Sequence, residues 1–551
     1  MRNPAATRRA GTRRAFWRGI GGLPPRGDAY AFLMPAAAGS ATHGVSLSFR
    51  GPAPACGRPQ GRRGRRVNAA LAVVGLVARI VVVFAALMAV PLAFALSAHD
   101  PAEDAFLAAA AITAITGASV AAATRRYRRE LLPRDGFLLV TLTWTLLPAF
   151  GALPLLLAIP GLSFTDAYFE AMSGLTTTGA TVLTGLDTLP VSINVWRCFM
   201  VLIGGMGIIV LVVAILPLLG VGGAQLFKSE TAGPLKDQKL TPRIAETARG
   251  LWTVYFVSSL ACFFAYRLAG MGWTDAFIHM CSTMGLGGFA AYDASFGHFQ
   301  SPAIEGVAVL FMALAGINFA LYFVAWRKRS PSVLWRDVEA RTYVLLLTAS
   351  VLGVAGYLSL QQVYPTFGES LRHAAFNVVS IATTTGFATV DYAQWPVFAP
   401  VFMLFLCSFA TCAGSTGGGI KLVRSLLLLK QARLELIRVL HPRAVVPVRL
   451  GATTVSAQVM SSVIAFMLLY GSVMVVATLA LLLSGLDLVT AATAVIACIN
   501  NTGPGLGQVG PAGNYQGLSD FQTWVCTVTM LLGRLELVAV LVVFTGAFWR
   551  K

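Results

Sequence analysis

Ten runs of about 20 apolar residues succeed one another along the chain, and each is long enough to cross a bilayer as a helix. Charged residues are nearly confined to the segments between these runs. The pattern predicts an all-α polytopic membrane protein. The predicted spans are residues 69–97, 104–123, 136–160, 193–220, 247–270, 303–326, 341–361, 398–430, 457–484 and 521–548.

Four segments of about 13 residues stand between spans and are too short to cross a bilayer as helices. They lie at roughly 165–177, 274–286, 372–384 and 489–501. Each follows an outer span and precedes an inner one, so we expect half-helices that enter from outside and return as extended backbone. Such backbone at membrane depth is tolerated only where it lines a water-filled path or is buried in protein.

Each short segment ends at a glycine after a similar upstream pattern. The glycines are Gly179, Gly288, Gly386 and Gly503, which are 109, 98 and 117 residues apart, and an alanine precedes each by twelve residues. This self-similarity predicts four covalently linked repeats, each with an outer helix, a pore helix and an inner helix, around one pore.

The repeats and a two-helix preface divide the chain into six parts. We predict a disordered basic leader at 1–66, the preface at 67–124, and pore repeats at 125–222, 223–330, 331–440 and 441–551. The four repeats run in parallel orientation, which disfavours a secondary carrier built from inverted repeats.

The distribution of basic residues predicts the topology. With both termini cytoplasmic, one set of loops carries clusters of Lys and Arg, whereas the opposite loops at 98–103, 184–192, 290–302, 387–396 and 504–520 carry none. This is the positive-inside rule. The basic residues on the predicted cytoplasmic side are Arg125, Arg126, Arg128, Arg129, Arg134, Lys228, Lys236, Lys239, Arg243, Arg327, Lys328, Arg329, Arg336, Lys430, Arg433, Arg438, Arg443, Arg449, Arg550 and Lys551.

The formal net charge of +19 comes largely from the leader. Residues 1–66 hold thirteen arginines, no lysine and one acid, Asp28, for a net +12. The leader has no sustained apolar period, so we expect it to be disordered and dispensable for transport. A transit peptide and an over-long start remain alternatives, and the sparse aromatics disfavour nucleic-acid binding.

Composition excludes several other classes of function. Hydrophobic residues make up 56% of the chain and charged residues 12%. The eight cysteines form no CxxC pair and the six histidines have no metal-ligand spacing, so buried, packing roles are expected for the cysteines. No cluster of His, Asp and Glu qualifies as a catalytic constellation, and we expect neither enzymatic activity nor a cofactor.

The four motifs suit a filter for a monovalent cation. Backbone carbonyls can replace the hydration shell of an alkali cation without fixed charge, and a glycine that adopts positive φ can turn them inward. No acidic ring accompanies the motifs, which argues against a divalent-cation filter. Packing of small residues between helices is the alternative for any one glycine. The predicted filter carbonyls belong to Thr177, Thr178, Leu286, Gly287, Thr384, Thr385, Asn501 and Thr502, and the filter glycines are Gly179, Gly288, Gly386 and Gly503.

At these motifs the chain resembles the Trk/Ktr/HKT superfamily of potassium transporters, and most closely the bacterial TrkH type. The resemblance covers about residues 67–551. It is carried by SGLTTTGAT (173–181), STMGLGGFAAYDASFG (282–297), IATTTGFAT (381–389) and NNTGPGLG (500–507), with support from KLTPRIAETARGLW (239–252) and CAGSTGGGIK (412–421). In this superfamily, glycine at all four filter positions goes with potassium, although the second motif departs from the threonine pattern.

The third inner span is interrupted by a glycine-rich segment, Gly414, Ser415, Thr416, Gly417, Gly418 and Gly419. Interior glycines destabilise a helix by about 1 kcal/mol each, and the resemblance implies that this break is a movable gate. Arg534 lies within the last span, where a cation is costly and usually faces a cavity or a partner. We expect it either to meet the glycine-rich segment beneath the filter as an electrostatic barrier or to form a structural salt bridge with another helix.

The resemblance further implies potassium uptake across the bacterial cytoplasmic (inner) membrane, a homodimer, and a separate TrkA-type cytosolic subunit that binds NAD or ATP. A sodium-permeable or weakly selective relative is the alternative. The sequence leaves open whether transport is channel-like or a proton-coupled symport.

Overall fold

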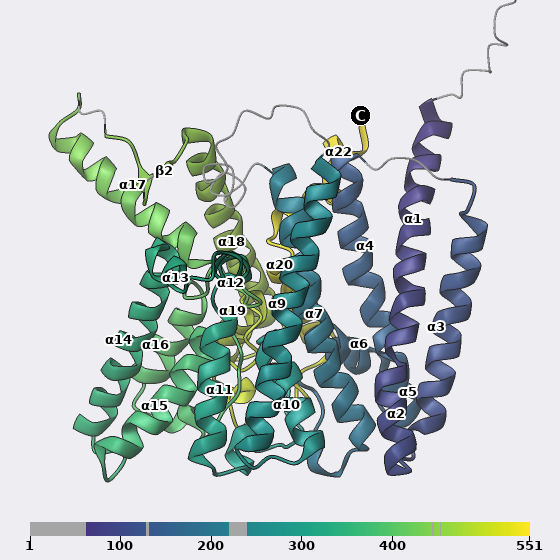
Figure 1. Ribbon diagram of the computed structural model, residues 1–551, viewed down its shortest axis with the longest axis horizontal. Helices are drawn as coiled ribbons and strands as arrows, with labels where there is room; N and C mark the ends of the chain where they lie inside the picture. The colour runs from purple at the N-terminus through teal and green to yellow at the C-terminus, as the bar shows by residue number, and fades with distance from the viewer. Residues whose placement is uncertain (1–61, 128–131, 220–239, 444–445, 452, 551) are drawn as a thin grey trace, which may run out of the picture. The chain divides into compact units, whose positions relative to one another are not determined.

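The computed structural model describes residues 62–127, 132–219, 240–443, 446–451 and 453–550, and nearly all of its regular structure is helical (Figure 1). The elements up to the first inner helix are α1 (Arg62–Leu87), α2 (Ala89–Ala98), α3 (Glu103–Ala123), α4 (Pro133–Gly151), α5 (Leu153–Ala158), α6 (Phe164–Leu175), η1 (Leu186–Thr188) and α7 (Val191–Leu219).

The middle of the chain continues the same succession of long and short helices. Its elements are α9 (Leu240–Leu268), α10 (Trp273–Gly285), η2 (Ser295–His298), α11 (Pro302–Ala315), α12 (Phe319–Lys328), α13 (Ser332–Arg336), α14 (Val338–Leu360), α15 (Phe367–Ala382), η3 (Tyr392–Gln394), α16 (Phe398–Cys407) and α17 (Leu422–Leu440).

The last part contains a two-stranded antiparallel ribbon, in which Arg449 pairs with Thr454 and Leu450 with Thr453. The elements are β1 (Arg449–Leu450), β2 (Thr453–Thr454), α18 (Ala457–Leu483), α19 (Leu488–Ile499), η4 (Gly507–Val509), α20 (Asp520–Arg534), α21 (Val538–Leu541), η5 (Val542–Phe544) and α22 (Gly546–Arg550).

Six helices in the described residues are long and apolar enough to cross a membrane, and two bent helix pairs would bring the number to eight. The six spans bury only 22% to 44% of their most apolar windows inside the protein. Apolar surface left outside on this scale would be unfavourable in water. In a bilayer it is the surface that faces lipid, and the chain is therefore a multi-pass membrane protein.

The four short helices confirm the segments predicted between the spans. They are α6, α10, α15 and α19, and α15 begins five residues earlier than the predicted start at 372. In the element order, α4, α9, α14 and α18 precede them, and α7, α11, α16 and α20 follow them.

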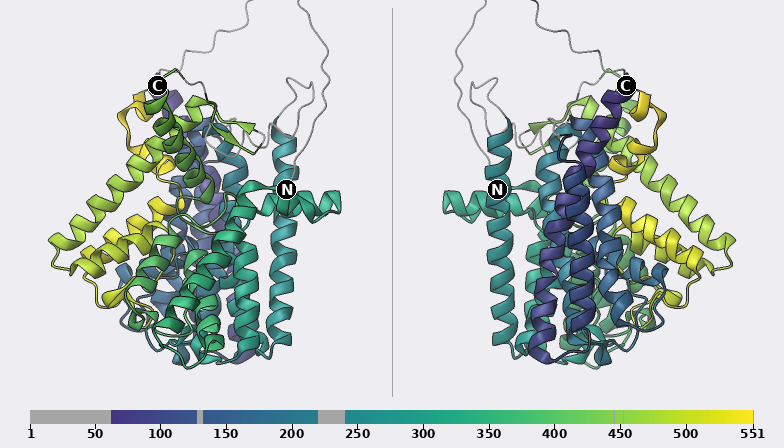
Figure 2. Two further views of the ribbon diagram at one scale, coloured as in Figure 1. Left: turned by 90° about the vertical axis from the view of Figure 1, so that its left-hand side faces the viewer. Right: turned by 90° about the vertical axis from the view of Figure 1, so that its right-hand side faces the viewer.

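Three predicted inner spans are not continuous helices. The third is interrupted between α16 and α17, where the glycine-rich segment predicted a break. The prediction of unbroken spans at 303–326 and 521–548 was wrong. The pair α11 and α12 bends by 88°, and the pair of α20 with residues 538–544 bends by 104°. Figure 2 shows the short α12 running across the direction of the long helices.

The helix ends next to the predicted basic loops lie together at one end of the structure. The start of α1, the end of α3, the start of α18 and the C-terminus lie at one end of the structure, away from α10 and α15 (Figure 1). The predicted disordered leader falls outside the described residues except at 62–66, which belong to α1, so its predicted boundary was wrong there. Lys228, Lys236 and Lys239 also lie outside the described residues.

Candidate functional site

Side-chain caps fix where three of the four short helices begin. The hydroxyl of Ser163 accepts the N–H of Asp166 at 3.0 Å, the hydroxyl of Thr366 accepts the N–H of Glu369 at 3.2 Å, and Asp487 caps α19 through the N–H of Thr490 at 2.9 Å. Such caps satisfy N–H groups that the first helical turn leaves unpaired. The helix α10 follows Gly272, which has no side-chain cap.

All four short helices end in the same pair of backbone hydrogen bonds. In α6, the N–H of Thr178 donates to the carbonyl of Ser173 at 2.8 Å, and that of Thr177 to Gly174 at 3.0 Å. This is a Schellman motif, whose penultimate residue takes the left-handed conformation and is usually glycine. In α10, the N–H groups of Gly287 and Leu286 donate to the carbonyls of Ser282 and Thr283. In α15, those of Thr385 and Thr384 donate to Ser380 and Ile381. In α19, those of Thr502 and Asn501 donate to Ala497 and Cys498.

The left-handed residue at each end is not glycine in any of the four motifs. Thr177, Leu286, Thr384 and Asn501 have φ of 53°, 55°, 60° and 54°. A positive φ is uncommon outside glycine and costs of order 1–3 kcal/mol per residue, and such residues cluster at functional sites. Positive φ was predicted only at the glycines, so this strain is a feature that the sequence pattern does not indicate.

The motif glycines adopt the predicted conformation and bring the four motifs into a closed ring. Gly179, Gly288, Gly386 and Gly503 have φ of 79°, 64°, 90° and 94°. A Cβ on Gly179 would collide with the carbonyl oxygen of Gly287. A Cβ on Gly288 would likewise collide with the carbonyl oxygen of Thr385. The same holds for Gly386 and the carbonyl of Thr502, and for Gly503 and the carbonyl of Thr178. Each glycine therefore packs against the carbonyl that precedes the glycine of the next motif, and the fourth motif returns to the first.

Hydroxyl and amide groups tie the ring internally. The hydroxyls of Thr176 and Thr178 lie 2.8 Å apart, and those of Thr383 and Thr385 likewise 2.8 Å apart. In the fourth motif, the Asn501 side chain donates to the Thr178 hydroxyl at 3.0 Å, which joins the last motif to the first. These side-chain hydrogen bonds help to fix the orientation of the ring backbone.

A buried ion pair stands behind the first and second motifs. Arg197 of α7 and Glu170 of α6 are both fully buried, and Arg197 Nε lies 2.7 Å from Glu170 Oε1. The Glu170 carboxylate also accepts the N–H of Val182, and Arg197 donates to the carbonyl of Ala290 at 3.2 Å. The pair therefore links the chain that leaves the first motif to the chain that leaves the second.

Breaking this pair should be strongly destabilising. Replacing Arg197 by methionine leaves the Glu170 carboxylate buried without its partner, and the loss of one member of a buried pair costs about 3–5 kcal/mol. We expect a large drop in the thermal unfolding midpoint in detergent. The matched control is Arg438→Met, which removes the exposed pair with Glu435 and should shift the midpoint little. Equal shifts for the two variants would contradict the structural role of Arg197.

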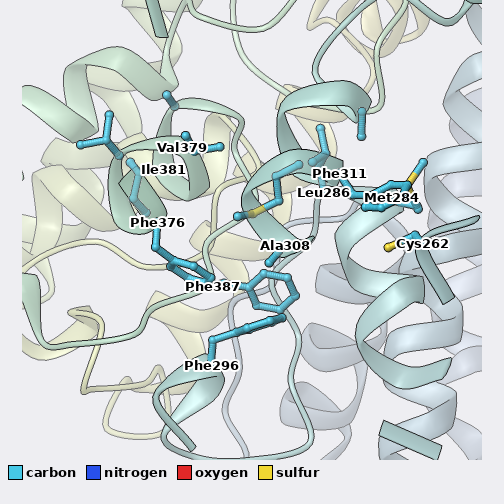
Figure 3. Packing of buried hydrophobic residues seen from close by; sticks show 14 of the residues in the cluster. Cys262, Met284, Leu286, Phe296, Ala308, Phe311, Phe376, Val379, Ile381 and Phe387 are labelled. Carbon is cyan, nitrogen blue, oxygen red and sulfur yellow. The ribbon is translucent and has the colours of Figure 1, made fainter. Parts of the chain in front are cut away.

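Aromatic packing supports the second and third motifs. Phe387 follows the third motif glycine, and its ring centroid lies 4.4 Å from that of Phe296. Phe296 in turn lies 5.2 Å from Phe376 of α15. Figure 3 shows these three rings together within the largest hydrophobic cluster, which also contains Met284 and Leu286. Dense packing of this kind resists displacement of the ring backbone.

The glycine-rich segment lies against all four short helices or their inner partners. The N–H of Gly418 donates to the hydroxyl of Thr384 at 2.8 Å, and the hydroxyl of Thr416 donates to the carbonyl of Met284 at 3.1 Å. A Cβ on Gly418 would collide with the carbonyl of Asn500. Four of its six residues, Ser415 to Gly418, are buried, so the segment packs closely against the ring.

Arg534 meets this segment. Its Nη1 donates to the carbonyl of Thr416 at 2.9 Å and its Nη2 to that of Gly204 at 3.2 Å, with 3% of the residue exposed. Among the ion pairs in the described chain none includes Arg534, so the salt-bridge alternative is not supported. Glu536 instead pairs with Arg424 at 2.5 Å. In addition, the ammonium of Lys421 donates to the carbonyl of Gly417, a contact that sequence analysis missed.

Comparison with known proteins agrees with this architecture. Residues 102–551 match the family model TrkH, described as a cation transport protein. The Trk system potassium uptake protein TrkH of Halomonas elongata is 45% identical over 474 residues, which cover 86% of this chain and 98% of that protein. The protein of the same name from Escherichia coli strain K12 is 43% identical over 481 residues, which cover 87% of this chain and 99% of that protein.

A solved structure is similar as well. The crystal structure of the potassium transporter TrkH from Vibrio parahaemolyticus superposes with a TM-score of 0.81 at 41% sequence identity, covering 88% of this chain and all of that one. The chain belongs to the TrkH family of cation transport proteins.

Proposed function

We propose that this protein takes up potassium through the ring of four motifs, which acts as a selectivity filter. The cation is coordinated by the carbonyls of Thr177, Thr178, Leu286, Gly287, Thr384, Thr385, Asn501 and Thr502, with Gly179, Gly288, Gly386 and Gly503 completing the filter. Relatives of similar length carry the name potassium uptake protein, which supports potassium as the transported ion. Potassium is the cargo here and not a resident cofactor.

The observation that carries the proposal is the closed ring of glycine-to-carbonyl contacts. In each motif two left-handed residues flank one that is not left-handed. An extended strand points successive carbonyls to opposite sides, whereas this alternation turns them toward the same side. Four such turns around one axis form a cage of carbonyl dipoles for a dehydrated alkali cation. The short helices add their C-terminal partial negative charge at the same place.

We propose further that the glycine-rich segment Gly414–Gly419 and Arg534 form the gate. The segment contacts the filter residue Thr384 and also Asn500, which precedes the filter residue Asn501. A permeating cation therefore has to displace the segment. The guanidinium of Arg534, which holds the segment through Thr416, adds a charge that repels cations. Movement of the segment is supported by its glycines, which interrupt the helix between α16 and α17.

The proposal places the protein in the bacterial inner membrane with both termini cytoplasmic, as a homodimer with a TrkA-type cytosolic subunit that binds NAD or ATP. Support for the orientation is the clustering of basic loops at one end of the helices. The relatives are named as parts of a Trk system, which supports a partner. Size-exclusion chromatography with light scattering and capture by a purified TrkA-type subunit test the dimer and the partner separately.

Growth on low potassium tests the function. Expression in a bacterium that lacks its own potassium uptake systems should restore growth at potassium concentrations where the empty strain stops. The Gly386→Asp variant, which places a side chain against the Thr502 carbonyl, should fail to restore growth although it reaches the membrane. No growth with the parent chain at normal membrane levels, or equal growth with both, would count against potassium uptake through this ring.

A further inference from the structure

One carboxylate holds both flanks of the glycine-rich segment. Glu339 lies in the first turn of α14, and its Oε1 atom accepts the backbone N–H of Ala413 at 2.8 Å and that of Val423 at 3.1 Å. Ala413 directly precedes the segment, and Val423 lies in the first turn of α17 beyond it. The two ends of the segment are therefore fixed to a single atom.

Two further hydrogen bonds attach the start of the segment to the bend between α11 and α12. The N–H of Cys412 donates to the carbonyl of Gly316 at 3.1 Å, and the N–H of Phe319 donates to the carbonyl of Gly414 at 3.1 Å. Three consecutive residues, 412 to 414, are thus bonded to residues 316, 339 and 319. These partners lie at or near the two ends of one stretch of chain, residues 316–339, which we term the corner segment.

The corner segment packs both internally and, through α12, against α9. It contains α12 and α13, which pack against each other, and α13 packs against α14. Asn318 caps α12 through the N–H of Ala320 at 2.9 Å, and Asp337 caps α14 through the N–H of Ala340 at 2.8 Å. Trp326 and Trp335 are 63% and 59% exposed, so these two side chains make little contact with the rest of the described chain.

Glu339 is the decisive attachment because one oxygen of its side chain binds both flanks of the segment. Hydrogen bonds that a carboxylate accepts from backbone N–H groups are roughly twice as strong as those between neutral groups. Without the carboxylate, the N–H groups of Ala413 and Val423 would be left without this partner in a partly buried place, which is unfavourable. Opening the segment requires the same two N–H groups to leave Glu339, so the carboxylate opposes opening directly.

We propose that Glu339 is a positioning residue that holds the gate shut, and that displacement of the corner segment releases it. This inference rests on the proposed function of Gly414–Gly419 as the gate. In the described part of the chain, the hydrogen bonds of the Glu339 side chain go to Ala413 and Val423 and not to the filter residues. Its replacement should therefore change how often the path is open and leave the choice between cations unchanged.

The test is rubidium uptake by liposomes that contain the purified full chain and no other protein. Glu339→Ala should raise basal uptake roughly tenfold, because it removes two charge-assisted hydrogen bonds from the closed state. Glu339→Gln keeps an acceptor oxygen without the charge and should fall between the parent and Glu339→Ala. The ratio of rubidium to sodium uptake should stay at the parent value in both variants, which a general loosening of the protein would not preserve.

A second variant removes a donor instead of the acceptor. Val423→Pro deletes one of the two N–H groups at a position in the first turn of α17, where proline is tolerated, and it should also raise uptake. If Glu339→Ala does not yield monodisperse protein, the uptake of Val423→Pro tests whether Glu339 holds the gate shut. The matched control is Glu435→Ala, an exposed carboxylate of α17, which should leave uptake unchanged.

Combination with a deletion of residues 414–419 separates this inference from the gate itself. If the deletion raises uptake and Glu339→Ala adds nothing to it, the two act on one barrier, as proposed. If the deletion raises uptake but Glu339→Ala and Val423→Pro alone do not, Glu339 does not hold the gate, although the gate stands. If the deletion leaves uptake unchanged, the proposed gate itself is wrong.

Discussion

Deleting residues 414–419 is expected to raise basal cation flux well above that of the parent chain in the absence of any cytosolic partner. The segment contacts Thr384, Met284 and the chain at Asn500, so its removal should take away a steric barrier if it is the gate proposed above. Arg534→Ala should act in the same direction. A unit charge about 8 Å from a cation, at an effective dielectric constant of about 20, opposes it by about 2 kcal/mol, or about thirtyfold in rate.

Flux of potassium and rubidium into liposomes measures both effects. Both variants should remain potassium selective, because neither change removes a carbonyl of the four motifs. The control is Arg438→Ala, which removes an exposed charge of α17 that pairs with Glu435 and should leave the flux unchanged. A folded, selective variant with flux no higher than the parent would show that the element it removes is not part of the gate.

Gly179→Ser is expected to relax selectivity toward sodium. Gly179 has φ of 79° and faces the carbonyl of Gly287 so closely that a Cβ cannot be added without a shift of backbone. Serine also disfavours this left-handed conformation. The ring must therefore widen or tilt on one side, and we expect the preference for potassium over sodium to fall by roughly tenfold, since about 1.4 kcal/mol of lost discrimination suffices.

A glycine in open space provides the control for this variant. Gly353 lies in α14 and has nothing within 4 Å of an added Cβ, so Gly353→Ser should keep the parent selectivity. Permeability ratios from reversal potentials in planar bilayers give the readout. Unchanged selectivity in Gly179→Ser would remove Gly179 from the filter, and equal changes in both variants would show that serine acts through general destabilisation.

The features that the sequence predicted are those that local chemistry determines. Apolar run length located the spans, and the shorter runs located α6, α10, α15 and α19. Positive φ at the motif glycines followed from their lack of a Cβ, and the structure has it at all four. The expectation that Arg534 meets the glycine-rich segment also holds, through the carbonyl of Thr416.

The features that the sequence missed depend on contacts between distant parts of the chain. Arg197 and Glu170 are 27 residues apart, and Glu339 binds N–H groups 74 and 84 residues away, so no local pattern marks them as partners. The bends of the second and fourth inner helices left weak signals. Asn318, a good helix cap after Gly316, stands at the first bend. At the second, Glu536 and Leu537 have positive φ, which their residue types do not suggest.

The most direct test of the central claim is cation flux through the purified full chain in liposomes under an imposed membrane potential, with potassium, rubidium and sodium compared. The account predicts that potassium and rubidium pass and that sodium passes much more slowly, with the difference reduced in Gly179→Ser. Sodium flux equal to that of potassium would favour the weakly selective alternative. The absence of flux of any of the three ions, in the parent chain and in the chain without residues 414–419 alike, would contradict a cation path through the ring of four motifs.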